Sequence, residues 1–85
     1  MLKDKYTLED LIELMRVLRS ENGCPWDREQ DHESLKKYLL EETYVVLEAI
    51  DLNDKDKLCE ELGDLLLQIV FHAQIEVEKD GFSMD

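Results

Sequence analysis

The chain has 85 residues, enough for one small domain, and it carries 22 acidic residues against 10 basic ones, a net charge of −12. This balance argues against nucleic-acid binding, which needs a basic surface, and against binding to an anionic membrane. No apolar run approaches the ~18 residues of a membrane span, and no secretory signal is recognisable. Cys24 and Cys59 are too few for a disulfide framework. We therefore expect a cytoplasmic domain with reduced thiols and neither a nucleic-acid nor a membrane partner.

The first predicted helix runs from about Leu8 to Ser20. Thr7 can cap its amino end, and Asp10 lies in the first turn, where the helix dipole favours negative charge. Asn22-Gly23 ends it, because glycine is the usual residue just past a helix C-terminus. Apolar residues at helical spacing form one stripe along it: Leu8, Leu11, Ile12, Met15 and Leu18.

The segment Cys24-Pro25-Trp26-Asp27 is predicted to be a loop, because proline cannot continue a helix and restricts the residue before it. Trp26 is the only tryptophan of the chain. One interpretation is that its ring plugs the end of a helical bundle. The other is that it forms a wall of a ligand pocket, where a flat ring can meet a nucleobase. The sequence leaves both interpretations open.

The second predicted helix covers about Glu33 to Leu52, and Asp31 or Ser34 can cap it. Glu42 lies near the middle of its broad apolar face, which is an unusual place for a charge. The residues of that face are Leu35, Tyr38, Leu39, Val46, Ala49 and Ile50. A second apolar strip, away from the first, consists of Leu40, Tyr44 and Leu47. Two strips need two partners, so we expect one partner in the same chain and the other in a second subunit.

The third predicted helix covers about Lys55 to Lys79 and is apolar almost all round, as expected for the interior of an assembly. Gly63 in mid-helix costs ~1 kcal/mol against alanine, which predicts the close approach of another helix there. No strand-like alternation occurs. The fold class is therefore all-α, a bundle of three main helices with short connections. The polar exceptions on the third helix fall on one line: Glu61, Asp64, Gln68 and His72.

The carboxylates of the second and third helices predict a metal site. Glu61 and Asp64 are three residues apart and share a helix face, and Glu42 can face them from the other helix. Convergent carboxylates repel one another unless a cation lies between them. Oxygen ligands without cysteine favour Mg²⁺, or Mn²⁺, and such an ion takes substrate phosphates as further ligands. The predicted chemistry is hydrolysis of a phosphoanhydride, with Glu41 orienting the attacking water or holding a second ion.

A plainer interpretation is that these carboxylates are surface charges paired with lysine or arginine. His72 is predicted to be a satisfied core or interface histidine. Five basic residues can reach phosphates: Arg16, Arg19, Arg28, Lys36 and Lys37. The sequence does not distinguish among them. We predict Lys36 and Lys37, together with Trp26, as substrate-binding residues.

Several motifs together resemble a MazG-type nucleoside triphosphate pyrophosphohydrolase domain, and the resemblance covers about Thr7 to Asp85. It implies an all-α fold that forms a homodimer or a higher homo-oligomer. The implied activity is cleavage of nucleoside triphosphates to the monophosphate and pyrophosphate with magnesium, typically to clear aberrant or surplus nucleotides. The motifs are Cys24-Pro25-Trp26-Asp27, Glu41-Glu42, Glu61-Leu62-Gly63-Asp64 and the apolar run through Phe71-His72-Ala73.

The family motif is EExxE followed by ExxD. Carried over to this chain, it implies Glu42, Glu61 and Asp64 as metal ligands and Glu41 as an accessory acid, whereas Val45 stands at the third glutamate position and cannot ligate. The family domain also continues with a further helix, so residues 1–85 would be a C-terminally truncated domain that lacks the last of four core helices. Two hypotheses follow: a magnesium-dependent pyrophosphohydrolase weakened by Val45, or a degenerate, non-catalytic module for dimerisation or regulation.

Overall fold

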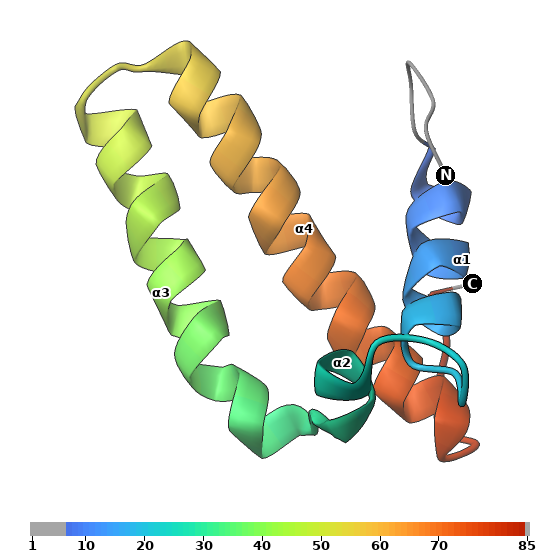
Figure 1. Ribbon diagram of the computed structural model, residues 1–85. Coiled ribbons are helices and arrows are strands. Elements are labelled where there is room, and N and C mark those ends of the chain that lie inside the picture. Colours follow the sequence, from blue (N-terminus) through green and yellow to red (C-terminus); the bar gives the residue numbers. More distant parts are fainter. Residues whose placement is uncertain (1–6, 85) are drawn as a thin grey trace.

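The computed structural model describes residues 7–84, which form four α-helices and no strand (Figure 1). The all-α prediction is confirmed, and the three main helices end within two residues of the expected bounds. Residues 1–6 and Asp85, which belong to the predicted domain, lie outside the described part. The helices are α1 (Leu8–Leu18), α2 (Pro25–Glu29), α3 (His32–Asp51) and α4 (Lys55–Glu78).

Side-chain caps determine where the long helices begin, because the first backbone N–H groups of a helix have no partner within it. The Thr7 hydroxyl accepts from the Asp10 N–H at 3.2 Å, and the Asp10 carboxylate accepts from the Thr7 N–H at 3.0 Å. Asp31 caps α3 by accepting from the Ser34 N–H, and Asp54 caps α4 in the same way. The predicted caps at Thr7 and Asp31 are therefore confirmed.

The prediction of a loop at Cys24–Asp27 is wrong, because Pro25 begins the short helix α2. Proline is tolerated in the first turn of a helix, where its missing N–H would have no helical partner. The Arg28 N–H donates to the carbonyl of Cys24 at 3.0 Å and closes the turn. Trp26 is thereby held on a helix instead of a loop.

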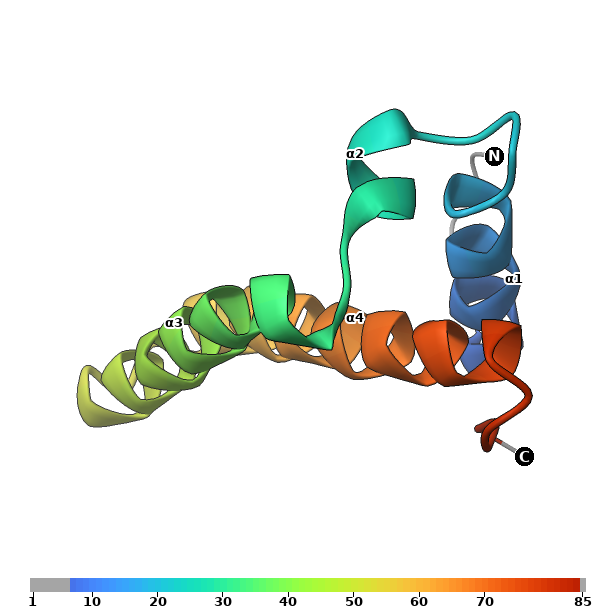
Figure 2. The same ribbon diagram turned by 90° about the horizontal axis from the view of Figure 1, so that it is seen from below.

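Helices α3 and α4 form an antiparallel hairpin, and α1 lies beside the C-terminal half of α4 (Figure 1). Figure 2 shows α1 and α2 on one side of the layer formed by α3 and α4. The core lies where α1 and α3 meet the C-terminal half of α4. Its buried residues are Met15, Leu35, Val70, Phe71 and Ile75.

Arg19 ties three helices together from a buried position, since only 7% of its side chain is exposed. Its Nε and Nη2 atoms donate to the Glu78 carboxylate on α4 at 2.8 and 3.0 Å. Its Nη1 atom donates to the carbonyls of Asp27 and Gln30 at 2.6 and 2.8 Å. The guanidinium also lies 5.5 Å from the ring centroid of Phe71. These contacts use four of the five N–H donors of Arg19 and hold it in a buried position, so it is not placed to reach a phosphate as the sequence had allowed.

Much apolar surface stays exposed within residues 7–84. The second strip of α3 is among the most exposed, with Leu40 at 58%, Tyr44 at 64% and Leu47 at 49%. Helix α4 is only partly interior, because Leu62 and Ile69 are both nearly half exposed. No described atom lies within 4 Å of a Cβ built on Gly63. The close helix approach expected at Gly63 is therefore not made within the described part of the chain.

Candidate metal centre

Three carboxylates converge between α3 and α4. Glu42 comes from α3, and Glu61 and Asp64 come from successive turns of α4. One carboxylate oxygen of each residue lies within 4.8 Å of the other two. The i, i+3 spacing puts Glu61 and Asp64 on one helix face, and the antiparallel packing of α3 turns Glu42 toward them.

The environment of Glu42 is unfavourable for an isolated negative charge. The side chain is half-buried, and its Oε2 atom is fully buried without a hydrogen-bond partner among the described residues. Burial raises the pKa of Glu42, and the nearby Glu61, Asp64 and Glu41 carboxyls raise it further. A carboxylate placed in this way requires a proton or a cation as its counterpart.

The donor set fits a hard divalent cation. All three candidate ligands offer carboxylate oxygens, which suit Mg²⁺ or Mn²⁺ better than softer metals. Magnesium ligands lie at 2.0–2.1 Å, so two ligands on opposite sides of the ion are about 4 Å apart. The spread of the three oxygens is compatible with that size, and the orphaned oxygen of Glu42 leaves a further coordination or hydrogen-bonding atom available.

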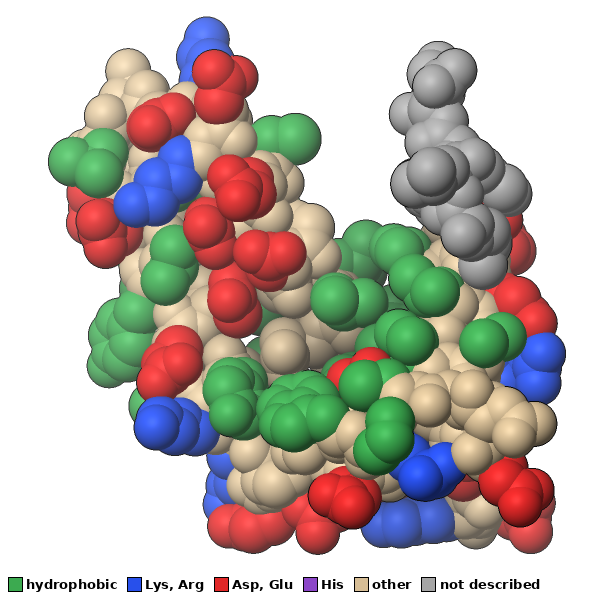
Figure 3. Space-filling model, viewed as in Figure 1, with side chains coloured by type: hydrophobic (Ala, Val, Ile, Leu, Met, Phe, Trp, Pro, Cys, Tyr) green, Lys and Arg blue, Asp and Glu red, His purple; other side chains and the backbone are tan. Residues whose placement is uncertain are grey.

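The surroundings of the cluster are acidic on one side and apolar on the other. Figure 3 shows Asp and Glu side chains gathered over α3 and α4 toward their connecting turn, beside a group of hydrophobic side chains. Glu41 is exposed, and Val45 is half-buried one helical turn after Glu42. At its position Val45 adds apolar surface and no ligand atom.

The structure supports the first of the two interpretations of Trp26, in which the ring plugs the end of the helical bundle. Its ring packs edge to face against Tyr38 and Phe71, with centroids 5.8 and 6.5 Å away, so it covers part of the core. It nevertheless remains 48% exposed. Tyr38, which contacts Trp26, lies one turn before Glu42 on α3.

The two predicted lysines are less directly connected to the cluster. Lys36 pairs with Glu33 at 3.3 Å on the exposed side of α3. It also lines a shallow groove whose other residues are Leu39, Leu40 and Thr43. Lys37 is exposed and lies four residues before Glu41, so the two share a helix face. No described contact brings either lysine to the three carboxylates.

Sequence reasoning missed a contact between the two histidines. The Nδ1 atoms of His32 and His72 are 2.7 Å apart, and His32 Nε2 lies 2.5 Å from Glu76 Oε2. The Nε2 atom of His72 is buried without a described hydrogen-bond partner, so the prediction of a satisfied histidine holds for one nitrogen only. The i, i+4 spacing of His72 and Glu76 is visible in the sequence, but the approach of His32 is not. The Gln68 side-chain oxygen is likewise buried and unpartnered within the described residues.

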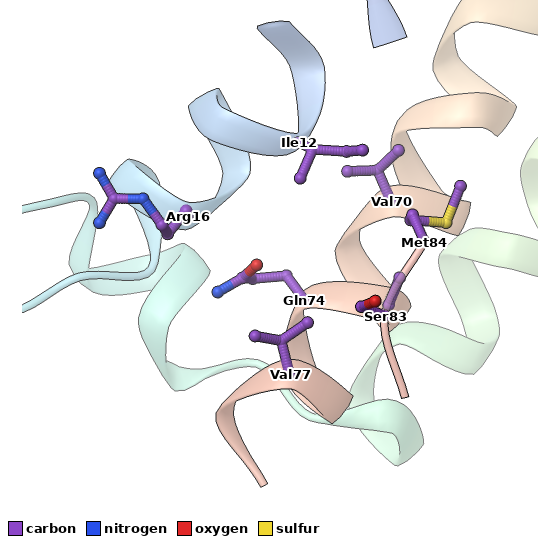
Figure 4. Close-up of a pocket in the computed structure, with 8 residues that line it drawn as sticks. Ile12, Arg16, Val70, Gln74, Val77, Ser83 and Met84 are labelled. Atoms are coloured by element: carbon purple, nitrogen blue, oxygen red, sulfur yellow. The ribbon is translucent and has the colours of Figure 1, made fainter. Parts of the chain in front are cut away.

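A separate cavity of about 210 Å³ lies between α1, α4 and the residues after α4. Its walls are mostly apolar, with Ile12, Val70 and Met84 among them, and Figure 4 shows the guanidinium of Arg16 directed away from them. Arg16 also pairs with Glu13 on its own helix. None of the converging carboxylates lines this cavity, so it does not belong to the candidate metal centre.

Comparison with known proteins places these residues in a family. A model of the MazG nucleotide pyrophosphohydrolase domain matches residues 30–85. The chain is 56% identical over 77 residues to the Nucleoside triphosphate pyrophosphohydrolase/pyrophosphatase MazG of Thermotoga maritima, which is 91% of this chain and 30% of that protein. It is 49% identical over 79 residues to the Nucleoside triphosphate pyrophosphohydrolase of Escherichia coli strain K12, 92% of this chain and 30% of that protein.

The chain is also 54% identical over 72 residues to the Uncharacterized protein YabN of Bacillus subtilis, which is 85% of this chain and 15% of that protein. It thus spans less than a third of the length of each of these relatives. The family match nevertheless covers well over half of the chain and includes all three converging carboxylates. The chain belongs to the MazG nucleotide pyrophosphohydrolase domain family.

Proposed function

We propose that the chain acts as a magnesium-dependent nucleoside triphosphate pyrophosphohydrolase, which converts a nucleoside triphosphate and water to the monophosphate and pyrophosphate. The observation that carries this proposal is the convergence of Glu42, Glu61 and Asp64 within 4.8 Å. The names of the Thermotoga and Escherichia relatives support the same reaction. We place this activity in the cytoplasm, where free thiols such as those of Cys24 and Cys59 stay reduced.

The proposed roles follow from where each acid lies. Glu42, Glu61 and Asp64 would hold Mg²⁺, with Mn²⁺ as the alternative ion. A bound ion supplies positive charge that polarises the phosphoanhydride and lowers the pKa of water. Glu41 is exposed beside this cluster and would orient the attacking water and accept its proton. The bond that breaks joins the α- and β-phosphates, and pyrophosphate leaves.

The proposed substrate contacts lie along α2 and α3. The exposed half of Trp26 would offer a flat surface for the nucleobase, beside Tyr38, which itself lies one turn before Glu42 on α3. Lys37 shares a face with Glu41 and would meet the phosphates as a point charge. Lys36 remains a predicted phosphate contact, and its side chain would have to leave Glu33 to make it.

We further propose that a second copy of the chain covers the strip of Leu40, Tyr44 and Leu47. These residues recur at helical spacing on α3, and the exposed fraction of each is 49% or more. An apolar strip of this kind on a helix requires a partner. A second α3 related by a two-fold axis would supply one, because such an interface uses the same patch on both subunits.

The activity is tested by measuring pyrophosphate release from each nucleoside triphosphate with and without magnesium. Two adjacent substitutions provide a matched pair: Glu61→Gln removes a proposed ligand, and Glu60→Gln removes an exposed charge outside the cluster. Changing a residue that only supports a metal ligand typically costs up to about 100-fold in activity. Because Glu61 is itself a proposed ligand, we expect Glu61→Gln to lower the rate by at least about 100-fold. Glu60→Gln should keep the rate. Equal effects of the two, or no pyrophosphate from any nucleotide, would contradict the proposal.

A non-catalytic dimerisation or regulatory module is the second candidate, and Val45 is the observation that favours it. The substitution Val45→Glu separates the two. If the site is active but weakened, magnesium affinity measured by calorimetry and turnover should rise together, because a fourth carboxylate adds charge and a ligand atom. If Val45→Glu binds no more magnesium and releases no pyrophosphate while the chain still dimerises, the module is the better description.

A further inference from the structure

The only two histidines of the chain meet edge to edge at the base of the α3–α4 hairpin. His32 is the first residue of α3, and His72 lies on α4. Their rings are within 2° of parallel with centroids 5.0 Å apart, and the two Nδ1 atoms are 2.7 Å apart. The other nitrogen of His32 contacts the Glu76 carboxylate at 2.5 Å. None of these three residues has a role in the proposed metal site.

The hydrogen-bond chemistry assigns the protons. Two nitrogens at this distance form a hydrogen bond when one proton lies between them. The ionised Glu76 carboxylate only accepts, so His32 Nε2 carries a hydrogen and donates it. With both rings neutral, His32 Nδ1 is then the acceptor and His72 Nδ1 is the donor. His72 therefore has the Nδ1–H tautomer, and its buried Nε2 atom carries no proton.

We propose that the chain Glu76–His32–His72 is a pH-sensitive clasp that holds the open end of the α3–α4 hairpin and comes apart on acidification. The connecting turn joins α3 and α4 only at their other ends (Figure 1), so this contact closes the ends farthest from the turn. A proton added to the pair ends on His72 Nε2, which has no described partner to accept its hydrogen bond. When both rings are charged, two N–H groups point at each other across the Nδ1 contact.

The clasp consists of these three residues alone, because the charged groups around it interact with other partners. Burial lowers the pKa of His72, and the adjacent His32 lowers it further. The clasp should therefore stabilise the fold fully above about pH 6.5, the ordinary histidine value, and lose its effect as the pH falls below it. The charged groups of the surrounding elements interact with partners outside the clasp. Arg19 is paired with Glu78, and Glu33 with Lys36. Asp31 accepts from the Ser34 N–H and is attracted by the charge of Lys79, and Arg28 donates to the carbonyls of Ser20 and Glu21.

Nitrogen NMR of the histidine-labelled full chain tests the proton arrangement directly. Two imidazoles give two sets of resonances, and His32→Gln assigns them. We expect His72 to carry its proton on Nδ1 at pH 7.5 and to reach half-protonation below about pH 6.5. If His72 carries its proton on Nε2 and is half-protonated at or above about pH 6.5, the clasp does not exist.

Urea unfolding between pH 7.5 and 5.5 tests the effect on stability. The unfolding equilibrium constant of the natural chain should rise on acidification, by at most tenfold per pH unit for each proton taken up. The double variant His32→Gln/His72→Gln should lose this rise. Glu33→Gln, an exposed change one residue from His32, should keep it. Equal pH dependence in the natural chain and the double variant would overturn the proposal, and the NMR result stands even if the variant folds poorly.

Discussion

The substitution Glu42→Gln should stabilise the metal-free protein and abolish its response to magnesium. One oxygen of Glu42 lies within 4.8 Å of an oxygen of Glu61 and of Asp64. At that distance two unit charges repel by ~0.9 kcal/mol even in water, so the two pairs give ~1.7 kcal/mol. Because Asp64 is exposed, a water-like dielectric is appropriate, and we expect a gain of about 1–2 kcal/mol from the neutral amide.

Magnesium should reverse the order of stability if the cluster is a metal site. A ligand that binds only the folded chain stabilises it by RT ln(1 + [L]/Kd), which is ~2.7 kcal/mol at a concentration a hundred times Kd and so exceeds the ~1.7 kcal/mol of repulsion. The natural chain should gain this amount, whereas Glu42→Gln should gain little because it has lost a ligand charge. Urea unfolding followed by circular dichroism, with and without magnesium, gives all four free energies of unfolding.

The control is Glu60→Gln, which makes the same change in charge on the exposed surface of α4. Its free energy of unfolding should change by no more than about 0.5 kcal/mol, and its magnesium response should be retained. The reasoning would be refuted if Glu42→Gln were less stable than the natural chain without magnesium and responded to magnesium as strongly. Glu42 would then be an ordinary half-buried charge with favourable contacts.

Three further predictions concern the fold and its assembly. Arg19→Met should cost about 2–3 kcal/mol in urea unfolding, because it leaves two backbone carbonyls without their donor and removes the partner of Glu78, whose side chain is 37% exposed. Arg16→Met, which breaks an exposed pair, should cost under about 1 kcal/mol, and equal costs would contradict the buried role of Arg19. The hydrogen bond from Arg19 lowers the pKa of Glu78 from 4.5, so the stabilisation by the Arg19–Glu78 pair should be complete above pH 4.5 and should fade as the pH falls further. The difference in free energy of unfolding between the natural chain and Arg19→Met should therefore shrink in acid. By sedimentation the natural chain should be a dimer and Leu47→Glu a monomer, and a Leu47→Glu chain that still dimerises would exclude the α3 strip as the interface.

The sequence by itself determined the three long helices, although it missed the short helix α2. Helical spacing of apolar residues identified α1, α3 and α4, and capping residues such as Thr7 and Asp31 marked their starts. These signals depend on residues within one or two turns, so no distant contact is needed to interpret them. The same spacing singled out Glu42, Glu61 and Asp64, which the structure brings within 4.8 Å. A charged residue on an apolar helix face is unusual enough to be recognised from the sequence before the residues that it faces are known.

Only the tertiary structure decided which distant side chains meet. Arg19 reaches Glu78 across 59 positions, and His32 reaches His72 across 40. Neither pair has a local pattern, because each depends on how one helix packs against another. The same packing decided that Trp26 lies against Phe71 and that the strip on α3 remains uncovered by the described residues. Helix formation is governed by neighbours along the chain, whereas burial of a charge or exposure of an apolar strip is governed by which surfaces the other helices cover.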